Sequence, residues 1–285
     1  MNLILTTHNL EQHFCRERSR TLRILGVLSF LILVAAPVSG TLSTRDETTP
    51  TFQPRIQAFQ PGETLIYDIS WSNIFAAGTA VMEVKSDMVP EGREVLKFLV
   101  TGRSVGLVDK LFKVHDVVQS VFDPQIMQSL TYSSDENYGK KRKRAVLVFD
   151  HVQNTVVSTV NEDLPKTLSI PEHVQDLLSS FYYLRAVVDF RRDKPIIFDV
   201  YEGGKIWTVE VHTLGREIVK TPAGEFSTIN MMTYPKYKGV FMRKGVVFIW
   251  LTDDSRKIPV LMKVTLPVGS FVFNLREMHQ EGGAR

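Results

Sequence analysis

Apolar and polar residues alternate along most of the chain from Gly62 onward, in runs separated by Gly, Pro, Asn or Asp. In the first run, Leu65 and Tyr67 alternate with Asp68 and Ser70. A period of two residues predicts a β-strand with one face in the core and the other toward water. The candidate strands are 64–73, 76–86, 94–103, 114–122, 126–133, 144–151, 154–160, 196–202, 205–213, 215–221, 226–233, 245–252, 259–266 and 271–277.

Several connections between these strands are short, such as Glu202-Gly203-Gly204 and Pro222-Ala223-Gly224. Tight turns join antiparallel neighbours, and consecutive hairpins make a meander. A meander must close into a barrel or protect its edges. The pattern therefore predicts a mainly β protein, with an antiparallel meander curled into a barrel or half-barrel, and leaves open whether the sheet closes.

One segment has a helical period instead. After Pro171-Glu172, apolar residues recur at spacings of three and four, at Val174, Leu177, Leu178, Phe181, Leu184 and Val188. This spacing predicts one amphipathic helix over 172–188, with the proline in its first turn. Its apolar side needs a partner, so we expect it to pack on the face or mouth of the sheet. A second short helical piece is predicted at 105–112.

The N-terminal segment has the order of a secretory signal. Four arginines between Arg16 and Arg23 precede the uncharged apolar run Ile24–Ala36 and the small residues of Pro37-Val38-Ser39-Gly40. The apolar run is shorter than the ~20 residues that span a bilayer, which favours cleavage near Gly40 over a retained anchor. We predict a signal peptide over 1–40, a flexible linker over 41–60, a single β domain over 61–280 and a disordered tail over 281–285.

The net charge and the position of the cysteine each argue against a class of function. The chain carries 34 basic and 31 acidic residues, and residues 1–40 account for four and two of them, which leaves a net charge of +1. Nucleic-acid binders show a basic excess, so none is predicted as a partner. The only cysteine, Cys15, precedes the apolar run, so the exported chain has no thiol for disulfides, metals or catalysis.

Motifs for chemistry are absent from the chain. There is no H-E-x-x-H metal motif, no G-x-S-x-G nucleophile elbow and no phosphate-binding loop. We predict no catalytic, cofactor-binding or metal-binding residues and no cofactor. Carboxylates from distant strands can come together in a fold without leaving a sequence motif. An enzyme with such a pair is the catalytic alternative that stays open.

The basic run Lys140, Lys141, Arg142, Lys143 and Arg144 is a candidate for contact with anionic head groups at a membrane surface. The alternative is a solvated loop or strand start, partly balanced by the two acidic residues just before it. The pair Asp253-Asp254 is predicted to be a polar turn, with aspartate capping backbone amides, and not a calcium site.

Some strands are apolar without alternation, as in Val246–Leu251. They could line a hydrophobic cavity with the helix as a lid, or they could form an ordinary core beneath that helix. On the cavity reading, the candidate ligand-lining residues are Trp71, Leu177, Phe181, Leu184, Trp207, Phe248 and Trp250.

The sequence resembles the domain-of-unknown-function 3108 family over about residues 58–278. The residues that carry the resemblance are Gly62-Glu63-Thr64-Leu65-Ile66-Tyr67 with Trp71, Ala77-Gly78-Thr79-Ala80, Val174-Gln175-Asp176-Leu177-Leu178-Ser179 with Tyr182-Tyr183-Leu184-Arg185, Thr221-Pro222-Ala223-Gly224-Glu225-Phe226, Ile249-Trp250-Leu251-Thr252-Asp253-Asp254 and Ile258-Pro259-Val260. The resemblance implies an exported, mostly antiparallel β protein of a Gram-negative-type bacterium. It implies no activity and no catalytic residues.

Together these observations predict an exported protein of the periplasm or cell envelope that binds or carries a hydrophobic, lipid-like ligand. The alternative is a structural or assembly factor of the envelope that acts through protein partners. By analogy, curled sheets with a helical lid shield acyl chains in periplasmic lipoprotein and glycolipid carriers.

Overall fold

The computed structural model describes residues 58–111, 113–190, 194–241, 246–266 and 269–281. The predicted signal peptide, most of the linker and nearly all of the tail lie outside these residues. The elements are β1 (Glu63–Trp71), β2 (Phe75–Met88), β3 (Glu94–Ser104), α2 (Gly106–Leu111), β4 (Val114–Asp123), β5 (Gln128–Tyr138), β6 (Lys141–Asp150), β7 (Thr155–Val160), β8 (Lys166–Ser169), β9 (Gln175–Asp176), α3 (Leu177–Val187), β10 (Ile196–Glu202), β11 (Lys205–Thr221), β12 (Gly224–Tyr237), β13 (Val240–Phe241), β14 (Val247–Thr252), β15 (Pro259–Leu266) and β16 (Gly269–Gln280).

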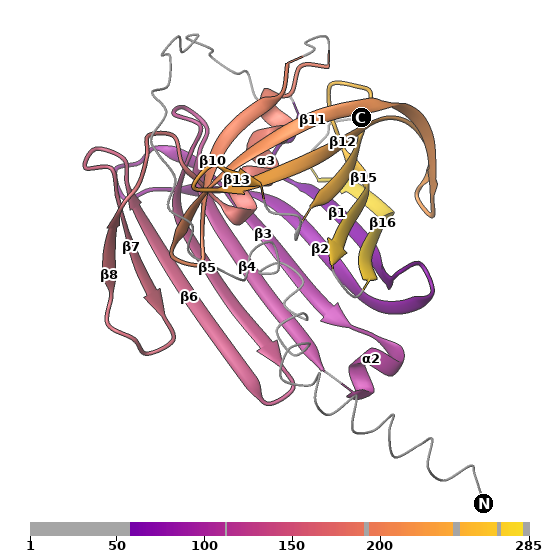
Figure 1. Ribbon diagram of the computed structural model, residues 1–285, viewed down its shortest axis with the longest axis horizontal. Coiled ribbons are helices and arrows are strands. Elements are labelled where there is room, and N and C mark those ends of the chain that lie inside the picture. The colour runs from indigo at the N-terminus through magenta and orange to yellow at the C-terminus, as the bar shows by residue number, and fades with distance from the viewer. Residues whose placement is uncertain (1–57, 112, 191–193, 242–245, 267–268, 282–285) are drawn as a thin grey trace, which may run out of the picture.

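All the described strands belong to one curled sheet (Figure 1). Its order is β8-β7-β6-β5-β4-β3-β2-β1-β16-β15-β14-β12-β11-β10-β9, with β13 paired to β12. Except for the parallel pair of β9 and β10, the ladders are antiparallel. The prediction of a mainly β, antiparallel meander is confirmed. Between the described strands the sheet is an open path that ends at β8 and β9, so it is a half-barrel and not a closed barrel.

Alternation of side chains gives most strands one buried face, as the sequence pattern predicts. In β1, Leu65, Tyr67 and Ile69 are buried while the residues between them are half-buried. The sheet also pairs β1 with β16, which joins the two ends of the meander. Buried residues of β1 and β16 share one hydrophobic core with those of α3.

Two kinds of difference from the predicted strands have physical reasons. β11 is one strand of 17 residues and not two, because a bulge between Thr213 and Gly215 absorbs the irregularity while pairing with β12 continues. The short strands β8, β9 and β13 were not expected, because two to four residues carry too little periodicity to detect.

The amphipathic helix is present as α3, on the concave side of the sheet, but it begins later than predicted. Pro171 is not in its first turn. Instead Asp176 is the N-cap, since its side chain accepts hydrogen bonds from the backbone amides of Leu178 and Ser179. The Ser179 hydroxyl accepts from the Asp176 amide and completes a capping box.

The second predicted helical piece is present as α2, between β3 and β4. Neither described helix is long and apolar enough to cross a membrane. The polar turn predicted at Asp253-Asp254 is confirmed, because the Asp254 carboxylate accepts from the amides of Arg256 and Lys257.

Candidate functional site

The N-terminal end of α3 is fixed to the sheet through a buried carboxylate. Asp176 is fully buried, and the hydroxyl of Ser120 in β4 donates to its Oδ2 at 2.6 Å. The hydroxyl of Ser129 in β5 donates to the same oxygen. Burial raises the pKa of Asp176, and these hydroxyl donors oppose the rise. The carboxylate therefore caps the helix and attaches it to two strands at once.

The C-terminal part of α3 is fixed by a buried guanidinium. Arg185 is fully buried and makes a bidentate pair with the Glu63 carboxylate of β1, at 2.7 and 2.9 Å. Its remaining donors bond to the carbonyl oxygens of Ala58, Arg256 and Lys257. Because both ends are held by several buried hydrogen bonds, α3 is a fixed part of the interior.

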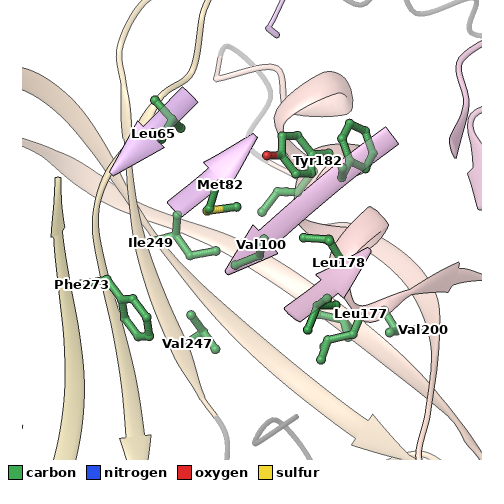
Figure 2. Close-up of a cluster of buried hydrophobic side chains, with 14 of the residues drawn as sticks. Leu65, Met82, Val100, Leu177, Leu178, Tyr182, Val200, Val247, Ile249 and Phe273 are labelled. Carbon is green, nitrogen blue, oxygen red and sulfur yellow. The ribbon is translucent and has the colours of Figure 1, made fainter. Parts of the chain in front are cut away.

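An apolar cavity of about 140 Å³ lies between α3 and the strands on either side of it. Figure 2 shows side chains of α3 gathered with those of strands from both halves of the sheet, including Val100, Val247 and Phe273. The residues that line the cavity are Tyr67, Ile69, Ala77, Gly78, Ala80, Met82, Val100, Gly102, Arg103, Ser104, Val108, Val114, Asp116, Leu177, Leu178, Phe181, Val247, Met262, Val264, Phe271 and Phe273.

One end of this cavity reaches the surface at the β3–β4 connection. There Arg103 is exposed, and Ser104 and Val108 are half-buried. Leu177 and Leu178 of α3, which are buried, also line the cavity. We call the surface end the mouth of the cavity. The mouth lies beside α2, and α3 forms the inner wall of the cavity.

Asp116 is the buried acidic residue of the lining. Its Oδ1 accepts from the backbone amide of Asn137 at 3.1 Å. Burial raises the pKa of this carboxyl to about 7, helped by the negative charges of Glu136 and Asp135 and opposed by the Asn137 hydrogen bond. Near neutral pH, a large fraction of the molecules therefore present an uncharged carboxyl to the cavity.

A second buried carboxyl, Glu202, feels the negative charge of Glu136 as Asp116 does. Burial raises the pKa of Glu202, at the end of β10, to about 7, while the positive charge of Lys143 opposes the rise. The Lys143 ammonium is 3.7 Å from Glu136, which also accepts a hydrogen bond from the Tyr138 hydroxyl. Strongly perturbed carboxyls are a common feature of functional sites, and of these two only Asp116 lines the cavity.

Two of the predicted ligand-lining residues, Leu177 and Phe181, line the cavity. Leu184, one turn further along α3, is buried in the core and does not. The helical period placed all three on one side, but only the first part of that side faces the open volume.

The three tryptophans and Phe248 lie elsewhere. Trp71 packs edge-on against Phe271, with Gly269 directly beneath its ring. Trp207 is buried with its indole bonded to the Glu202 carbonyl.

Phe248 and Trp250 are half-buried and alternate with the buried residues of β14. They therefore point to the convex face of the sheet, where the Trp250 indole donates to Glu217 at 2.6 Å. Neither side chain lines the cavity.

The basic run forms the β5–β6 turn and the start of β6. Arg142 and Arg144 pair with Asp135 across the hairpin. Lys140 and Lys141 are exposed, and no ion pair to either is found in the described ranges. Head-group contact stays a prediction for all five residues of the run.

Two residues that define the interior were given no role from the sequence, although Arg185 lies in one of the family motifs. Asp116 belongs to β4, whose other inward residues are mainly apolar. A charged residue at an inward position of this alternating strand was the sequence signal that could have indicated it. Arg185 occupies a helix position among apolar residues, which was a similar signal. Across the described part of the chain, no three His, Cys, Asp or Glu side chains are arranged to hold a metal ion.

A half-barrel with an anchored internal helix and a small apolar cavity defines a β-barrel-like class of protein. The family model described as "Protein of unknown function (DUF3108)" matches residues 66–276. The chain belongs to this family, as its sequence motifs indicated. No curated protein matches the chain.

Solved structures with a similar fold include a β-barrel-like protein of domain of unknown function DUF1849 from Brucella abortus. It is 11% identical, has a TM-score of 0.53, and the match covers 77% of this chain and 98% of that one. A candidate exported protein with a YmcC-like fold from Bacteroides fragilis is 10% identical, with a TM-score of 0.31 and coverage of 77% and 96%. A candidate lipoprotein from Parabacteroides distasonis is 8% identical, with a TM-score of 0.32 and coverage of 81% and 100%.

Proposed function

We propose that this protein is an exported cell-envelope protein that holds the apolar part of a lipid-like ligand in the cavity beside α3. The observation that carries the proposal is the lining: all but a few of its side chains are apolar, and they come from both halves of the sheet and from the helix. Apolar cavities with few polar groups are the usual form of small-molecule sites. The export signal predicted over residues 1–40 supports the envelope location.

The size of the cavity limits what part of a ligand it holds. Its volume of about 140 Å³ is close to the ~150 Å³ of an engineered apolar cavity that binds benzene. The cavity therefore accommodates the end of an acyl chain or a compact apolar group. The rest of a longer ligand would extend through the mouth.

Gly102 allows a direct test of this proposal. It lines the cavity, and a Cβ added to it would meet no atom within 4 Å. Gly102→Leu therefore fills the cavity without a backbone clash. Gly215→Leu is the matched control, since Gly215 is also in a strand with open space around it but is exposed and does not line the cavity.

The experiment is a fluorescence titration of the protein, stripped of bound lipid, with a short-chain acyl probe. We expect saturable binding by the parent and by Gly215→Leu, and at least a tenfold loss of affinity in Gly102→Leu. Absence of probe binding in the parent, together with no lipid in solvent extracts of the protein purified from cells, would refute the proposal.

The assembly-factor alternative has one observation in its favour. The edge strand β8 has four exposed residues, and Val146 and Val148 are exposed on β6, two strands in from that edge. An exposed edge of this kind can pair with a strand of another protein. Crosslinking in intact cells from position 167 separates the two functions, because an assembly factor would give a stable protein adduct there.

A further inference from the structure

The three chain connections at the mouth of the cavity lie next to one another. They are the β1–β2 turn, the β3–β4 connection with α2, and the β5–β6 turn, which follow one another because β2 pairs with β3 and β4 with β5 (Figure 1). The Val105 amide bonds to the Ala77 carbonyl, and the Gly139 amide bonds to the Lys113 carbonyl. These two hydrogen bonds hold the connections together as one surface, which we call the mouth surface.

Large apolar side chains project from this surface into solvent. Ile74, in the β1–β2 connection, and Phe75, the first residue of β2, are 71% and 59% exposed. Leu107 and Leu111, on α2, are 70% and 73% exposed. Single exposed apolar residues are ordinary, but four on adjacent connections around a cavity opening indicate a contact surface.

The same surface carries positive charge that is not neutralised locally. Lys110, Lys113, Lys140 and Lys141 are exposed, and none has an ion pair within the described ranges. The one acidic residue of α2 is half-buried, with its carboxylate accepting from the Ser104 hydroxyl at 2.6 Å. The mouth surface is therefore cationic around its exposed apolar residues.

We propose that the mouth surface docks on an anionic phospholipid bilayer. Apolar side chains next to lysines are what a membrane interface selects, because the apolar groups enter the acyl boundary while the ammonium groups contact head-group phosphates. The cavity opens on this surface at Arg103, Ser104 and Val108. Docking places the mouth against the bilayer, so that an acyl chain passes between membrane and cavity without crossing water.

Vesicle co-sedimentation of the full protein tests the docking, with phosphatidylcholine vesicles that contain or lack phosphatidylglycerol. In the first variant, Phe75→Ser is combined with Leu107→Ser. Its control combines Val152→Ser with Ile218→Ser, which are 94% and 66% exposed away from the mouth. We expect at least a tenfold weaker vesicle affinity for the mouth variant, from the lost apolar transfer, and no change for the control.

The charge variant combines Lys110→Gln with Lys140→Gln, and its control combines Lys194→Gln with Lys220→Gln. We expect roughly a fivefold loss per mouth lysine on anionic vesicles, and no loss on neutral ones. The control pair removes the same net charge and should bind as the parent does.

Equal binding by the parent and both mouth variants would overturn the docking proposal, as would an equal loss in mouth and control variants. A partner protein crosslinked at the mouth in cells, with no binding to vesicles, would also overturn it and identify a protein surface instead. Failure of the docking proposal can be told apart from failure of the proposed ligand binding. Gly102→Leu should bind vesicles as the parent does, and the mouth variants should still bind the acyl probe in solution.

Discussion

At the scale of single residues, Arg185 shows how one buried side chain joins segments that are far apart in the sequence. Its guanidinium bonds to Glu63 of β1, to the Ala58 carbonyl, and to two carbonyls of the β14–β15 turn. The planar fork of an arginine satisfies several acceptors at once, which suits a fully buried position. Phe59 and Tyr182 also lie within cation–π distance of it.

Replacing Arg185 with Met should destabilise the protein by about 3–5 kcal/mol, because the Glu63 charge would remain buried without its partner. Arg216→Met is the matched control. Arg216 pairs with Asp253 at the surface, its side chain is 62% exposed, and the loss should stay below about 1 kcal/mol. Urea denaturation measures both. Similar losses in the two variants would contradict the structural role of the buried pair.

Asp116 makes stability depend on pH. Its pKa in the folded protein is raised from 3.8 to about 7, so between those values the folded state binds more protons than the unfolded state. Stability therefore falls as pH rises from about 4 to about 7, and the full cost is present above that range. Glu202 contributes in the same direction.

Asp116→Asn should remove this cost while keeping an oxygen to accept the Asn137 amide. We expect the variant to be more stable than the parent at pH 8, on the order of 1–4 kcal/mol, with the difference vanishing near pH 4. Chemical denaturation across this pH range measures the effect, and exposed Asp163→Asn serves as control. A difference that does not change with pH would show that folding does not shift the pKa of Asp116.

At the scale of elements, α3 has two different apolar environments along one side. Leu177 and Phe181 face the cavity. Tyr182 stacks on Phe98 with ring centroids 3.8 Å apart, and Leu184 is buried in packed core. The helix therefore acts as a wall of the cavity near its start and as ordinary core filling near its end.

The difference can be measured with two truncations. Phe181→Ala should destabilise by less than the ~3–5 kcal/mol typical of a buried Phe, because this side chain is half-buried and borders open volume. Leu184→Ala should show the ~2–5 kcal/mol loss of a packed leucine.

Acyl-probe binding distinguishes the two positions further. It should weaken in Phe181→Ala and remain unchanged in Leu184→Ala at a temperature where both are folded. Full destabilisation of Phe181→Ala with unchanged probe binding would show that α3 only fills the core.

At the scale of the whole molecule, the two edges of the open sheet differ in exposure to solvent. The β9 edge is two buried residues that run directly into α3. The β8 edge is exposed along its length and pairs only with β7. Covering one edge with the helix leaves the other as the edge open to pairing with a further strand.

Hydrogen exchange should reflect this asymmetry. Amides of β8 should exchange orders of magnitude faster than those of β3 and β4, since an edge strand opens locally without disrupting the core. Exchange followed by mass spectrometry resolves the peptides. Strong protection of residues 166–169 would indicate that a partner or a second copy covers the edge in solution.

The strands, their antiparallel order and the presence of one amphipathic helix were predictable from the sequence, because each depends on local periodicity or short turns. The family was predictable for a related reason, since its motifs are short stretches such as Thr221–Phe226. The start of α3 was predicted five residues early. A proline suits a first turn, but the capping geometry of Asp176 depends on serines of β4 and β5.

Only the tertiary structure decided the cavity, its mouth and the open edge. Leu184, Phe248 and Trp250 fit the same apolar patterns as Leu177 and Phe181, yet they lie in the core or on the convex face. Which inward side chains meet open volume depends on sheet curvature and on pairings such as β1 with β16, which join residues about 200 positions apart. Periodicity carries no information about such distant contacts, so it could indicate which residues point inward but not what they meet there.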